Sequence, residues 1–338
     1  MSTRRSSGPR RRGPRRGLVL GGGGVLGAAW TIGALCAVEE IEGWDPRTAE
    51  FLVGTSAGAV LAALLGTGAT PRQLRDHQRG VRIGYGPLAG HKFDYKDGSG
   101  GALPTLPRPG IGSSRLLFRT ALRPWRHPPT AVVSAFVPPG RGSLEGIRAL
   151  VETVATDGEW SPHPGVRVVA MDYETGRRVP FGHPGSPQAR LSNAVMASCA
   201  IPGWYAPVEI DGRRYIDGGA CSTTSADLLA GLGLDEVYVL APMASFALDQ
   251  PTAMAARLER RWRRAVTRRL VHEVRKVHTA GSDVTLIAPG PQDLEAMGAN
   301  VMDPERRLRV LETSLRTSVV GLRNPRTRPH PDDLASAG

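Results

Sequence analysis

Two glycine-rich turns constrain the fold of this chain more than any other feature. The first, residues 21–27, follows the short apolar run 18–20, and the second, residues 54–58, follows the apolar run 51–53. Each turn leads into a segment rich in alanine and leucine with the periodicity of a helix. A strand, a turn and a helix repeated in this order are typical of a parallel sheet covered by helices. We therefore predict an α/β fold.

The rest of the sequence extends this pattern. We predict two hairpins, over 166–181 and over 208–216, and the second has a tight Asp-Gly turn. Residues 80–112 are rich in glycine and proline, and they form either a lid or an insert without fixed structure. Further strands are expected over 236–240 and 284–287, and helices over 25–40, 57–65, 113–122, 143–155, 192–199, 226–232, 254–277 and 304–319.

Composition limits the cofactors and the compartment. The chain has 338 residues, of which 41% are apolar, enough for a large hydrophobic core. Its three cysteines, Cys36, Cys199 and Cys221, argue against a disulfide framework and favour a reducing compartment. Cysteine and histidine show no metal-ligand spacing. We therefore expect a cytoplasmic protein, peripheral at the membrane if its basic segments bind lipid, with no metal and no cofactor.

The N-terminal region resembles an export signal in one respect. Arg15 and Arg16 precede the apolar stretch 17–38, but this stretch contains four consecutive glycines, a poor composition for an inserted apolar helix. We interpret it as the first strand, turn and helix of the domain. No other run is long and apolar enough to span a bilayer.

The net charge of +12 is concentrated in the N-terminal residues and in the predicted helix over 254–277. The first 14 residues are rich in arginine and nearly free of apolar side chains, so we expect a disordered tail before a hydrolase domain over 15–322. Residues 323–338 are expected to form a second loose tail. The N-terminal arginines suit either an arm for anionic lipid or nucleic acid, or a solvated tail without a partner, which is the simpler interpretation. Nucleic acid is not an expected partner.

The predicted helix over 254–277 is also basic. Arginines surround its apolar stripe, so the helix either lies on an anionic membrane or packs on the sheet, and we favour packing. An anionic membrane remains a candidate peripheral partner, while the oligomeric state is open. The predicted stripe consists of Leu258, Trp262, Val266, Leu270, Val274 and Val277.

The second turn has the pattern of a nucleophile elbow. Ser56 lies at the centre of Gly-x-Ser-x-Gly, between a predicted strand and a predicted helix. Residues two before and two after such a serine crowd together, which explains Gly54 and Gly58. The helix that follows adds the positive end of its dipole.

The first turn allows several interpretations. Gly22, Gly24 and Gly27 fit a dinucleotide-binding pattern, but the acidic residue expected at the end of the next strand is absent. A phosphate loop would need a lysine that this turn lacks. A tight turn with close helix packing and an oxyanion hole remain. Only the oxyanion hole explains why a nucleophile elbow follows one strand later.

A serine nucleophile needs a base. None of the eight histidines lies in a strand-to-loop context, whereas Asp217 ends a predicted strand and precedes Gly218 and Gly219. A carboxylate in contact with the hydroxyl can act as the base. The alternative is an ordinary Asp-Gly turn.

These segments together resemble the bacterial patatin-like phospholipase family. The similar blocks are residues 22–27, 54–58 and 217–219, with a fourth over 197–202 followed by Ala206 and Pro207. The resemblance spans roughly 17–287. It implies a patatin-type three-layer fold with a mostly parallel central sheet flanked by helices. It also implies a Ser-Asp dyad without histidine and lipid acyl-ester hydrolysis without a metal.

The resemblance assigns roles by position. It implies Ser56 as nucleophile, Asp217 as base, and backbone donors of the oxyanion hole at Gly22, Gly23 and Gly24, although four glycines in this turn leave open which N–H groups point inward. The expected protein is a serine lipid acyl hydrolase (a phospholipase, lysophospholipase or acylglycerol esterase) acting through an acyl-enzyme. The alternative is a non-catalytic lipid- or membrane-binding protein with the same fold. The supporting glycines are Gly27, Gly54, Gly58, Gly218 and Gly219.

Overall fold

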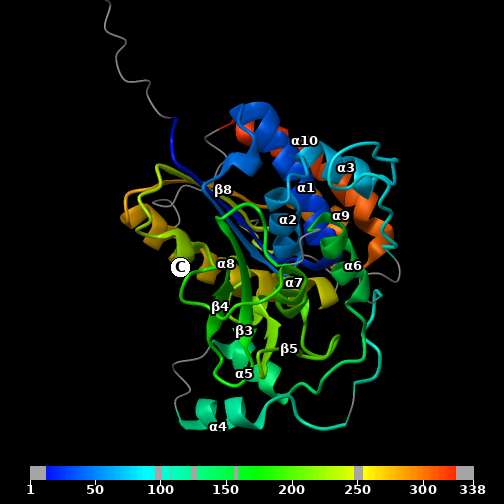
Figure 1. Ribbon diagram of the computed structural model, residues 1–338, viewed down its shortest axis with the longest axis vertical. Helices are drawn as coiled ribbons and strands as arrows, with labels where there is room; N and C mark the ends of the chain where they lie inside the picture. Colours follow the sequence, from blue (N-terminus) through cyan, green and yellow to red (C-terminus); the bar gives the residue numbers. More distant parts are fainter. Residues whose placement is uncertain are drawn as a thin grey trace, which may run out of the picture.

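The described residues fold around one eight-stranded sheet with helices on both faces (Figure 1). The computed structural model describes residues 13–95, 101–107, 109–122, 128–155, 159–246 and 254–324, apart from the side chains at 255, 256 and 258. The tail expected over 1–14 thus lies outside this range except for its last two residues, as does the tail over 323–338 except for its first two. The strands are β1 (Arg16–Leu20), β2 (Phe51–Thr55), β3 (Val166–Asp172), β4 (Arg178–Phe181), β5 (Val208–Ile210), β6 (Arg213–Asp217), β7 (Glu236–Leu240) and β8 (Asp283–Ile287).

The helices follow most of the predicted segments. The α-helices are α1 (Gly24–Glu42), α2 (Ala57–Gly66), α3 (Pro71–Gln78), α4 (Ser114–Leu122), α5 (Pro129–Phe136), α6 (Glu145–Val154), α7 (Leu191–Cys199), α8 (Met254–Thr279), α9 (Pro291–Met297) and α10 (Arg307–Arg323). The short 3₁₀ helices are η1 (Pro46–Thr48), η3 (Gly218–Ala220), η4 (Ala226–Leu229) and η5 (Pro304–Arg306).

The sheet has a parallel centre and an antiparallel end. Its strand order is β5-β6-β3-β2-β1-β7-β8, and β4 also pairs with β3. The run β3-β2-β1-β7-β8 is parallel throughout, whereas β4 and β6 pair antiparallel with β3, and β5 pairs antiparallel with β6. This arrangement confirms the mostly parallel central sheet. Both predicted hairpins are present, as β3–β4 and β5–β6.

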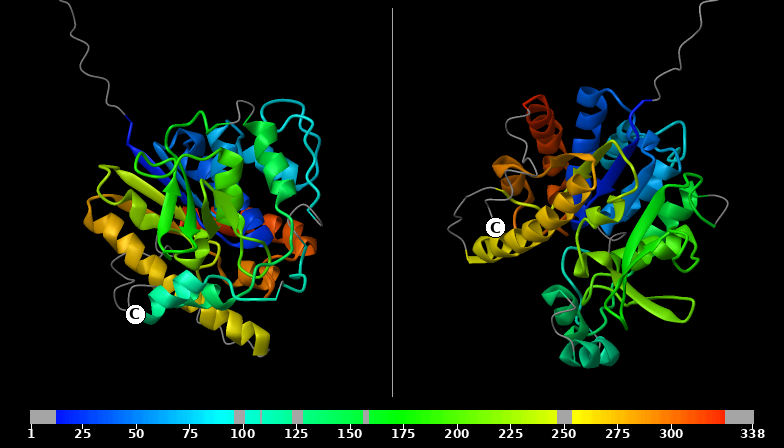
Figure 2. Two further views of the ribbon diagram at one scale, coloured as in Figure 1. Left: turned by 60° about the horizontal axis from the view of Figure 1, so that its bottom comes forward. Right: turned by 90° about the vertical axis from the view of Figure 1, so that its left-hand side faces the viewer.

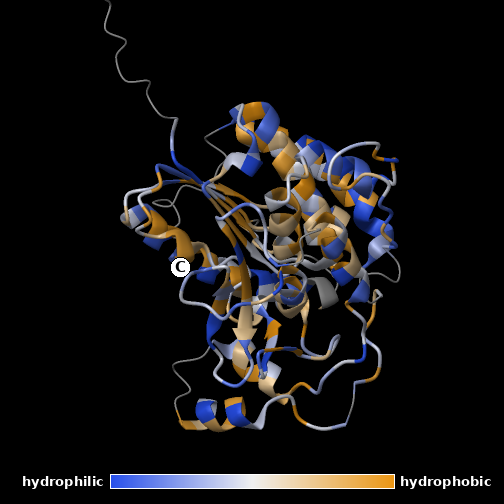
Figure 3. Ribbon diagram, viewed as in Figure 1, coloured by the Kyte–Doolittle hydropathy of each residue, from blue (hydrophilic) through white to orange (hydrophobic). Residues whose placement is uncertain are grey.

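Side chains of the central strands alternate between two hydrophobic cores. Leu18 and Leu20 of β1 belong to the core shared with α1 and α2, whereas Val19 belongs to the core shared with α8. This alternation follows from the two-residue period of a strand. Figure 2 shows α8 on one side of the sheet and α1 with α10 on the other, and Figure 3 shows hydrophobic strands between them. The fold therefore has the three layers that the resemblance implies.

Helix α1 is the core helix predicted from the N-terminal apolar stretch. Among the described helices it has the length and composition to cross a membrane, but most of it is buried. It packs on α10, where Ser314 Oγ donates a hydrogen bond to the Trp30 carbonyl at 2.7 Å. A Cβ added at Gly33 would lie 2.7 Å from Ser314 Cβ, so glycine permits this close crossing.

The predicted helices differ from the structure in several places. The helix predicted over 226–232 is only the short η4, because Gly231 and Gly233 adopt positive φ angles of 77° and 70° just after it. Helix α3 was not predicted because its residues are mostly polar. Its start nevertheless carries a capping box, in which Thr70 and Gln73 exchange hydrogen bonds, and Pro71 occupies the first helical position.

The apolar stripe of α8 is correct in its second half and wrong in its first. Trp262 is exposed, and Arg263 and Thr267 take the buried positions instead. The buried guanidinium of Arg263 forms an ion pair with Glu259 and donates to the Pro242 carbonyl at 2.7 Å. Leu258 falls outside the described side chains. The stripe residues that do pack in the core are Leu270, Val274 and Val277.

Candidate active site

Ser56 lies on a sharp turn between β2 and α2. Its φ and ψ angles are +54° and −124°, a strained conformation that a non-glycine residue adopts only when the surroundings hold it. A Cβ at Gly54 would lie 2.4 Å from the Gly58 carbonyl oxygen, and one at Gly58 would lie 1.9 Å from that of Leu20. Only glycine fits at either position, as the elbow geometry requires.

Helix α7 supports this turn through a residue to which sequence reasoning gave no role. The buried hydroxyl of Ser198 accepts a hydrogen bond from the Ser56 N–H at 2.8 Å and donates one to the Val169 carbonyl at 2.5 Å. The hydroxyl therefore joins the elbow to β3. Ser198 belongs to the block over 197–202 in the family resemblance, and this block was the one sequence feature that pointed to a role for it.

Asp217 meets Ser56 at the end of β6. Ser56 Oγ donates a hydrogen bond of 2.6 Å to Asp217 Oδ2, and the Gly219 N–H donates one of 2.7 Å to Oδ1. Both side chains are buried. Burial raises the pKa of the Asp217 carboxyl to about 6, although the hydrogen bonds from Ser56 and Gly219 oppose this shift. The pair thus combines a hydroxyl with a carboxylate that binds protons more readily than an exposed aspartate.

The glycines after Asp217 allow this approach. A Cβ at Gly218 would lie 2.3 Å from the Val169 carbonyl oxygen, and one at Gly219 would lie 2.9 Å from Asp217 Oδ1. Any larger residue at 218 would push β6 away from β3. Both glycines are therefore required to hold the carboxylate beside the serine.

The first glycine turn lies directly against Ser56, and its N–H groups are not equivalent. The Gly22 N–H donates to the Thr223 carbonyl at 2.8 Å, so it is not available to a ligand in this arrangement. The N–H groups of Gly23 and Gly24 donate no hydrogen bond within the described part of the chain. They lie at the N-terminus of α1, where partial positive charge gathers.

Gly22 and Gly27 also determine the shape of this turn. A Cβ at Gly22 would lie 3.0 Å from Ser56 Cβ, and the Gly27 N–H donates to the Gly23 carbonyl at 2.8 Å. The turn therefore lies close to Ser56, and a hydrogen bond from the first turn of α1 holds its end in place. Of the three predicted oxyanion-hole donors, Gly23 and Gly24 remain candidates, because the Gly22 N–H already has a partner.

No histidine among the described residues bonds to Ser56 or Asp217. His77 instead bonds through Nδ1 to the Tyr95 hydroxyl and through Nε2 to His91 Nδ1, both at 3.0 Å. Burial and the neighbouring His91 lower the pKa of His77 to about 4, so the ring is neutral near pH 7. In the same described ranges, no three His, Cys, Asp or Glu side chains gather as a metal site.

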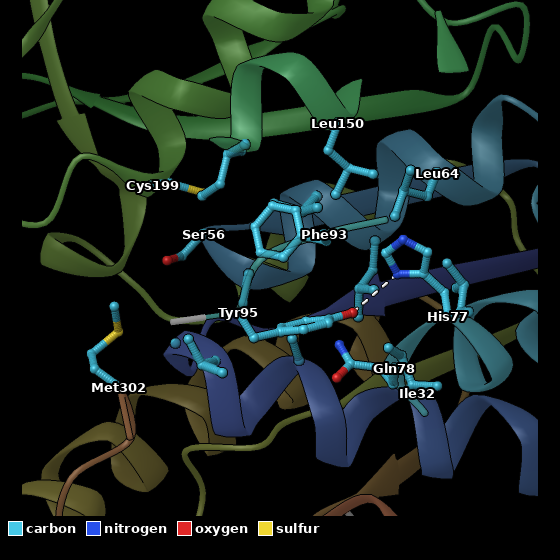
Figure 4. Close-up of a pocket in the computed structure, with 18 of the residues that line it drawn as sticks. Ile32, Ser56, Leu64, His77, Gln78, Phe93, Tyr95, Leu150, Cys199 and Met302 are labelled. Atoms are coloured by element: carbon cyan, nitrogen blue, oxygen red, sulfur yellow. Dashed lines mark hydrogen bonds between the residues drawn. The ribbon is translucent and has the colours of Figure 1, made fainter. Parts of the chain in front are cut away.

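Ser56 faces an elongated apolar cavity between α1, α2 and α6. Figure 4 shows Ser56 and Met302 at one end of it, and His77 and Gln78 at the other. Phe93 and Tyr95, from the loop predicted over 80–112, form part of its wall; residues 96–100 and 108 of that loop lie outside the described residues. Its apolar lining includes Val25, Ala28, Ile32, Val60, Leu61, Leu64, Leu74, Ile147 and Leu150.

On its other side Ser56 borders an open cleft, which we call the mouth. The mouth contains Asp217 and the glycine turn, and side chains of α5 and α8 form its rim. The dyad therefore lies between an apolar cavity and an opening to solvent. The remaining residues of the mouth are Thr130, Val133, Ser134, Val137, Ile201, Pro202, Gly219, Ala220, Thr223, Met243, Trp262 and Val301.

Comparison with solved structures finds distant neighbours. VipD from Legionella pneumophila is 14% identical with a TM-score of 0.41, and the match covers 92% of this chain and 67% of that one. The type III effector protein ExoU is 16% identical with a TM-score of 0.35, and the match covers 92% of this chain and 53% of that one.

Comparison with protein families gives a direct match. The family model described as patatin-like phospholipase matches residues 18–230, more than half of the chain. The matched range contains both glycine turns, Ser56 and Asp217. This family implies lipid acyl hydrolase activity. The chain belongs to the patatin-like phospholipase family.

Proposed function

We propose that this protein hydrolyses acyl esters of lipids, with Ser56 as nucleophile and Asp217 as the only general base. The observation that carries the proposal is the 2.6 Å hydrogen bond from Ser56 Oγ to Asp217 Oδ2 at the edge of an apolar cavity. A carboxylate in direct contact with a hydroxyl can remove its proton without a histidine between them.

The first half of the reaction forms an acyl-enzyme. Ser56 Oγ attacks the ester carbonyl carbon while its proton passes to Asp217, and the carbonyl oxygen becomes an oxyanion. The free N–H groups of Gly23 and Gly24 donate hydrogen bonds to this oxygen. When the tetrahedral intermediate collapses, the bond to the alcohol breaks and the alcohol oxygen takes the proton from Asp217.

The second half repeats these steps with water. The oxygen of a water molecule attacks the acyl carbon while Asp217 takes a proton from this water. The tetrahedral intermediate then releases Ser56, whose oxygen recovers that proton. Free fatty acid is the product. Asp217 therefore gives and receives one proton in each half of the cycle, a role that its raised pKa suits.

The surroundings of the dyad support a lipid substrate. The apolar cavity beside Ser56 suits an acyl chain, because it is lined mainly by aliphatic and aromatic side chains. The open mouth suits the alcohol part of the ester, which leaves through it. A phospholipid, a lysophospholipid and an acylglycerol all meet these requirements.

A lipid-class screen with matched variants tests the proposal. Wild-type protein should release fatty acid from at least one of these classes, and Ser56→Ala and Asp217→Asn should each lower the rate by several orders of magnitude. Because the two act as a unit, the double variant should be about as slow as either single one. A fluorophosphonate should label Ser56 alone, as read by mass spectrometry. Normal activity of folded Ser56→Ala would refute the dyad, and lipid binding without hydrolysis would favour a non-catalytic protein.

A further inference from the structure

Helices α4 and α5 carry large apolar side chains that nothing in the described structure covers. Phe118 and Leu122 on α4 are 68% and 61% exposed, and Val133 and Phe136 on α5 are 61% and 60% exposed. They follow helical spacing, at i and i+4 on α4 and at i and i+3 on α5, so each helix presents an apolar stripe. The two helices protrude from the bottom of the molecule in Figure 1.

These stripes are not core residues displaced by poor packing. Each helix also has a buried side, with Leu116 on α4 and Ala131 and Ala135 on α5, in a small core beside Tyr173. The Tyr173 hydroxyl donates to the Ser134 carbonyl at 2.7 Å, which fixes α5. The helices are therefore anchored on one side and apolar on the other.

The exposed apolar surface continues to the mouth of the active site. Val133 of α5 lines the mouth, and so does Trp262 of α8, which is 43% exposed. On α5, Thr130 Oγ1 donates to the Ala220 carbonyl at 2.6 Å, just beyond Asp217 in the chain. We call Phe118, Leu122, Val133, Phe136 and Trp262 the mouth patch.

Arginines flank this patch. On α4, Arg115 and Arg119 share the exposed side with Phe118, and Figure 3 shows hydrophilic and hydrophobic residues mixed along this helix. Arg115 lies 3.9 Å from the Glu174 carboxylate, whereas Arg119 has no acidic partner among the described residues. On α8, Arg261 and Arg268 are exposed at i and i+7 beside Trp262, and neither has an acidic partner among the described residues. Helix α5 carries no charged residue at all. The chemistry is thus an apolar centre with a cationic border.

We propose that the mouth patch is the surface by which this protein binds an anionic lipid membrane. Apolar side chains of this size gain free energy by entering the acyl region of a bilayer, while flanking arginines bind lipid phosphates at the interface. A protein partner would not require the patch to adjoin the entrance to the lipid site, as it does at Val133 and Trp262. A membrane does, because a lipid can then pass from the bilayer into the mouth without crossing water.

The inference rests on the proposed function, since it takes the substrate to be a membrane lipid. Co-sedimentation with vesicles tests membrane binding separately from hydrolysis when Ser56→Ala protein is used, because no substrate is then consumed. The vesicles contain phosphatidylcholine, either alone or mixed with phosphatidylglycerol. The test variant is Phe118→Glu/Phe136→Glu, which places two carboxylates on exposed positions outside the mouth. Its matched control is Val320→Glu, an equally exposed apolar position on α10.

We expect Phe118→Glu/Phe136→Glu to bind mixed vesicles at least about tenfold more weakly than the parent, and Val320→Glu to bind like the parent. Arg115→Glu/Arg119→Glu should lose the preference for phosphatidylglycerol, whereas Arg309→Glu on α10 should keep it. With Ser56 restored, the ratio of the rate on vesicles to the rate on a soluble ester should fall in Phe118→Glu/Phe136→Glu. The soluble ester reports whether the site is intact.

Equal vesicle binding by Phe118→Glu/Phe136→Glu and Val320→Glu would overturn the membrane surface, even if hydrolysis is normal. The phenylalanines could instead hold two copies of the chain together. A dimer that is lost in Phe118→Glu/Phe136→Glu and kept in the other variants would therefore also overturn the membrane surface. Patch-dependent vesicle binding in a protein that hydrolyses no ester would retain the surface and refute the proposed function.

Discussion

Ser198 and Ser56 lie 142 positions apart in the chain, yet the hydroxyl of the first holds the backbone of the second. The contact stabilises the strained, positive-φ conformation of the Ser56 backbone. We predict that Ser198→Ala lowers kcat by roughly tenfold, because a buried N–H loses its acceptor and the elbow shifts. KM should change little, since Ser198 does not line the cavity or the mouth.

Steady-state kinetics on a soluble ester checks this prediction, with a thermal melt to follow folding. Ser192→Ala is the matched control, because Ser192 is buried on the same helix but bonds to Glu152. If both variants lose kcat to the same extent, the effect belongs to α7 as a whole and not to the support of Ser56.

The raised pKa of Asp217 predicts a pH dependence. The base must be ionised to accept the Ser56 proton, so kcat/KM should fall as the pH drops through about 6. An aspartate at the ordinary value of 3.8 would keep its activity to much lower pH. Rates on a neutral ester across this range, with enzyme returned to pH 8 as a test of reversibility, give the apparent pKa. A profile that is flat from pH 7 to about 4.5 would contradict the assignment.

The same shift affects stability with a definite sign. The folded protein binds a proton at Asp217 more tightly than the unfolded chain, so this group's contribution to stability falls as pH rises from 3.8 to about 6. Asp217→Asn removes the buried charge. We therefore expect its Tm relative to wild type to be higher at pH 8 than at pH 4, as measured by calorimetry. An identical Tm difference at both pH values would mean that Asp217 does not titrate differently on folding.

The proposal that Asp217 acts without a histidine gives a sharp expectation. His272→Gln and His278→Gln should each leave kcat within about tenfold, whereas removal of a triad base would cost a thousandfold or more. Their pH profiles should keep the apparent pKa near 6, which separates an aspartate from a histidine with a similar value. A large loss in either variant would restore a triad.

The oxyanion turn should be sensitive to a single methyl group. A Cβ at Gly23 would lie 2.9 Å from Gly27 Cα and 3.1 Å from Pro242 Cγ, so Gly23→Ala must shift the turn and its free N–H groups. We expect a loss of about a hundredfold in kcat, comparable to losing one oxyanion donor. Gly321→Ala on α10, where a Cβ meets nothing within 4 Å, is the control. Unchanged turnover in folded Gly23→Ala would contradict the expectation that a Cβ at this position displaces the N–H groups of the turn.

The arginine-rich tail allows one further measurement. Deletion of residues 1–14 should weaken binding to anionic vesicles and flatten its dependence on salt, because such attraction is screened over about 8 Å at physiological ionic strength. The deletion stops before Arg15, whose ion pair with Glu50 belongs to the folded domain. Identical binding curves across a salt series would leave the tail without a membrane role.

Local sequence predicted those parts of the site that local backbone geometry determines. An elbow needs glycines at fixed positions around Ser56, and a strand end followed by two glycines places Asp217, so both patterns are visible in short segments. The strand alternation of β1 and β2 follows equally from neighbouring residues. These are features that a few consecutive residues control.

Features that depend on distant partners could not be predicted in this way. The Gly22 N–H is occupied because the Thr223 loop folds back onto the turn, and Trp262 is exposed because Arg263 finds Glu259 and the Pro242 carbonyl. A hydropathy pattern assigns tryptophan to the core and arginine to solvent, and it contains no information about these partners. Ser198 is a similar case, since no local rule connects α7 with the elbow.

The antiparallel pairing of β6 with β3 also sets when the chain becomes able to react. Ser56 and its elbow are made early in synthesis, whereas Asp217 is added 161 residues later. Until the ribosome has passed that point and β6 has paired with β3, the nascent chain has Ser56 without the carboxylate that we propose as its base. Under the proposed mechanism, a chain terminated before β6 therefore cannot form the acyl-enzyme, however well its elbow is folded.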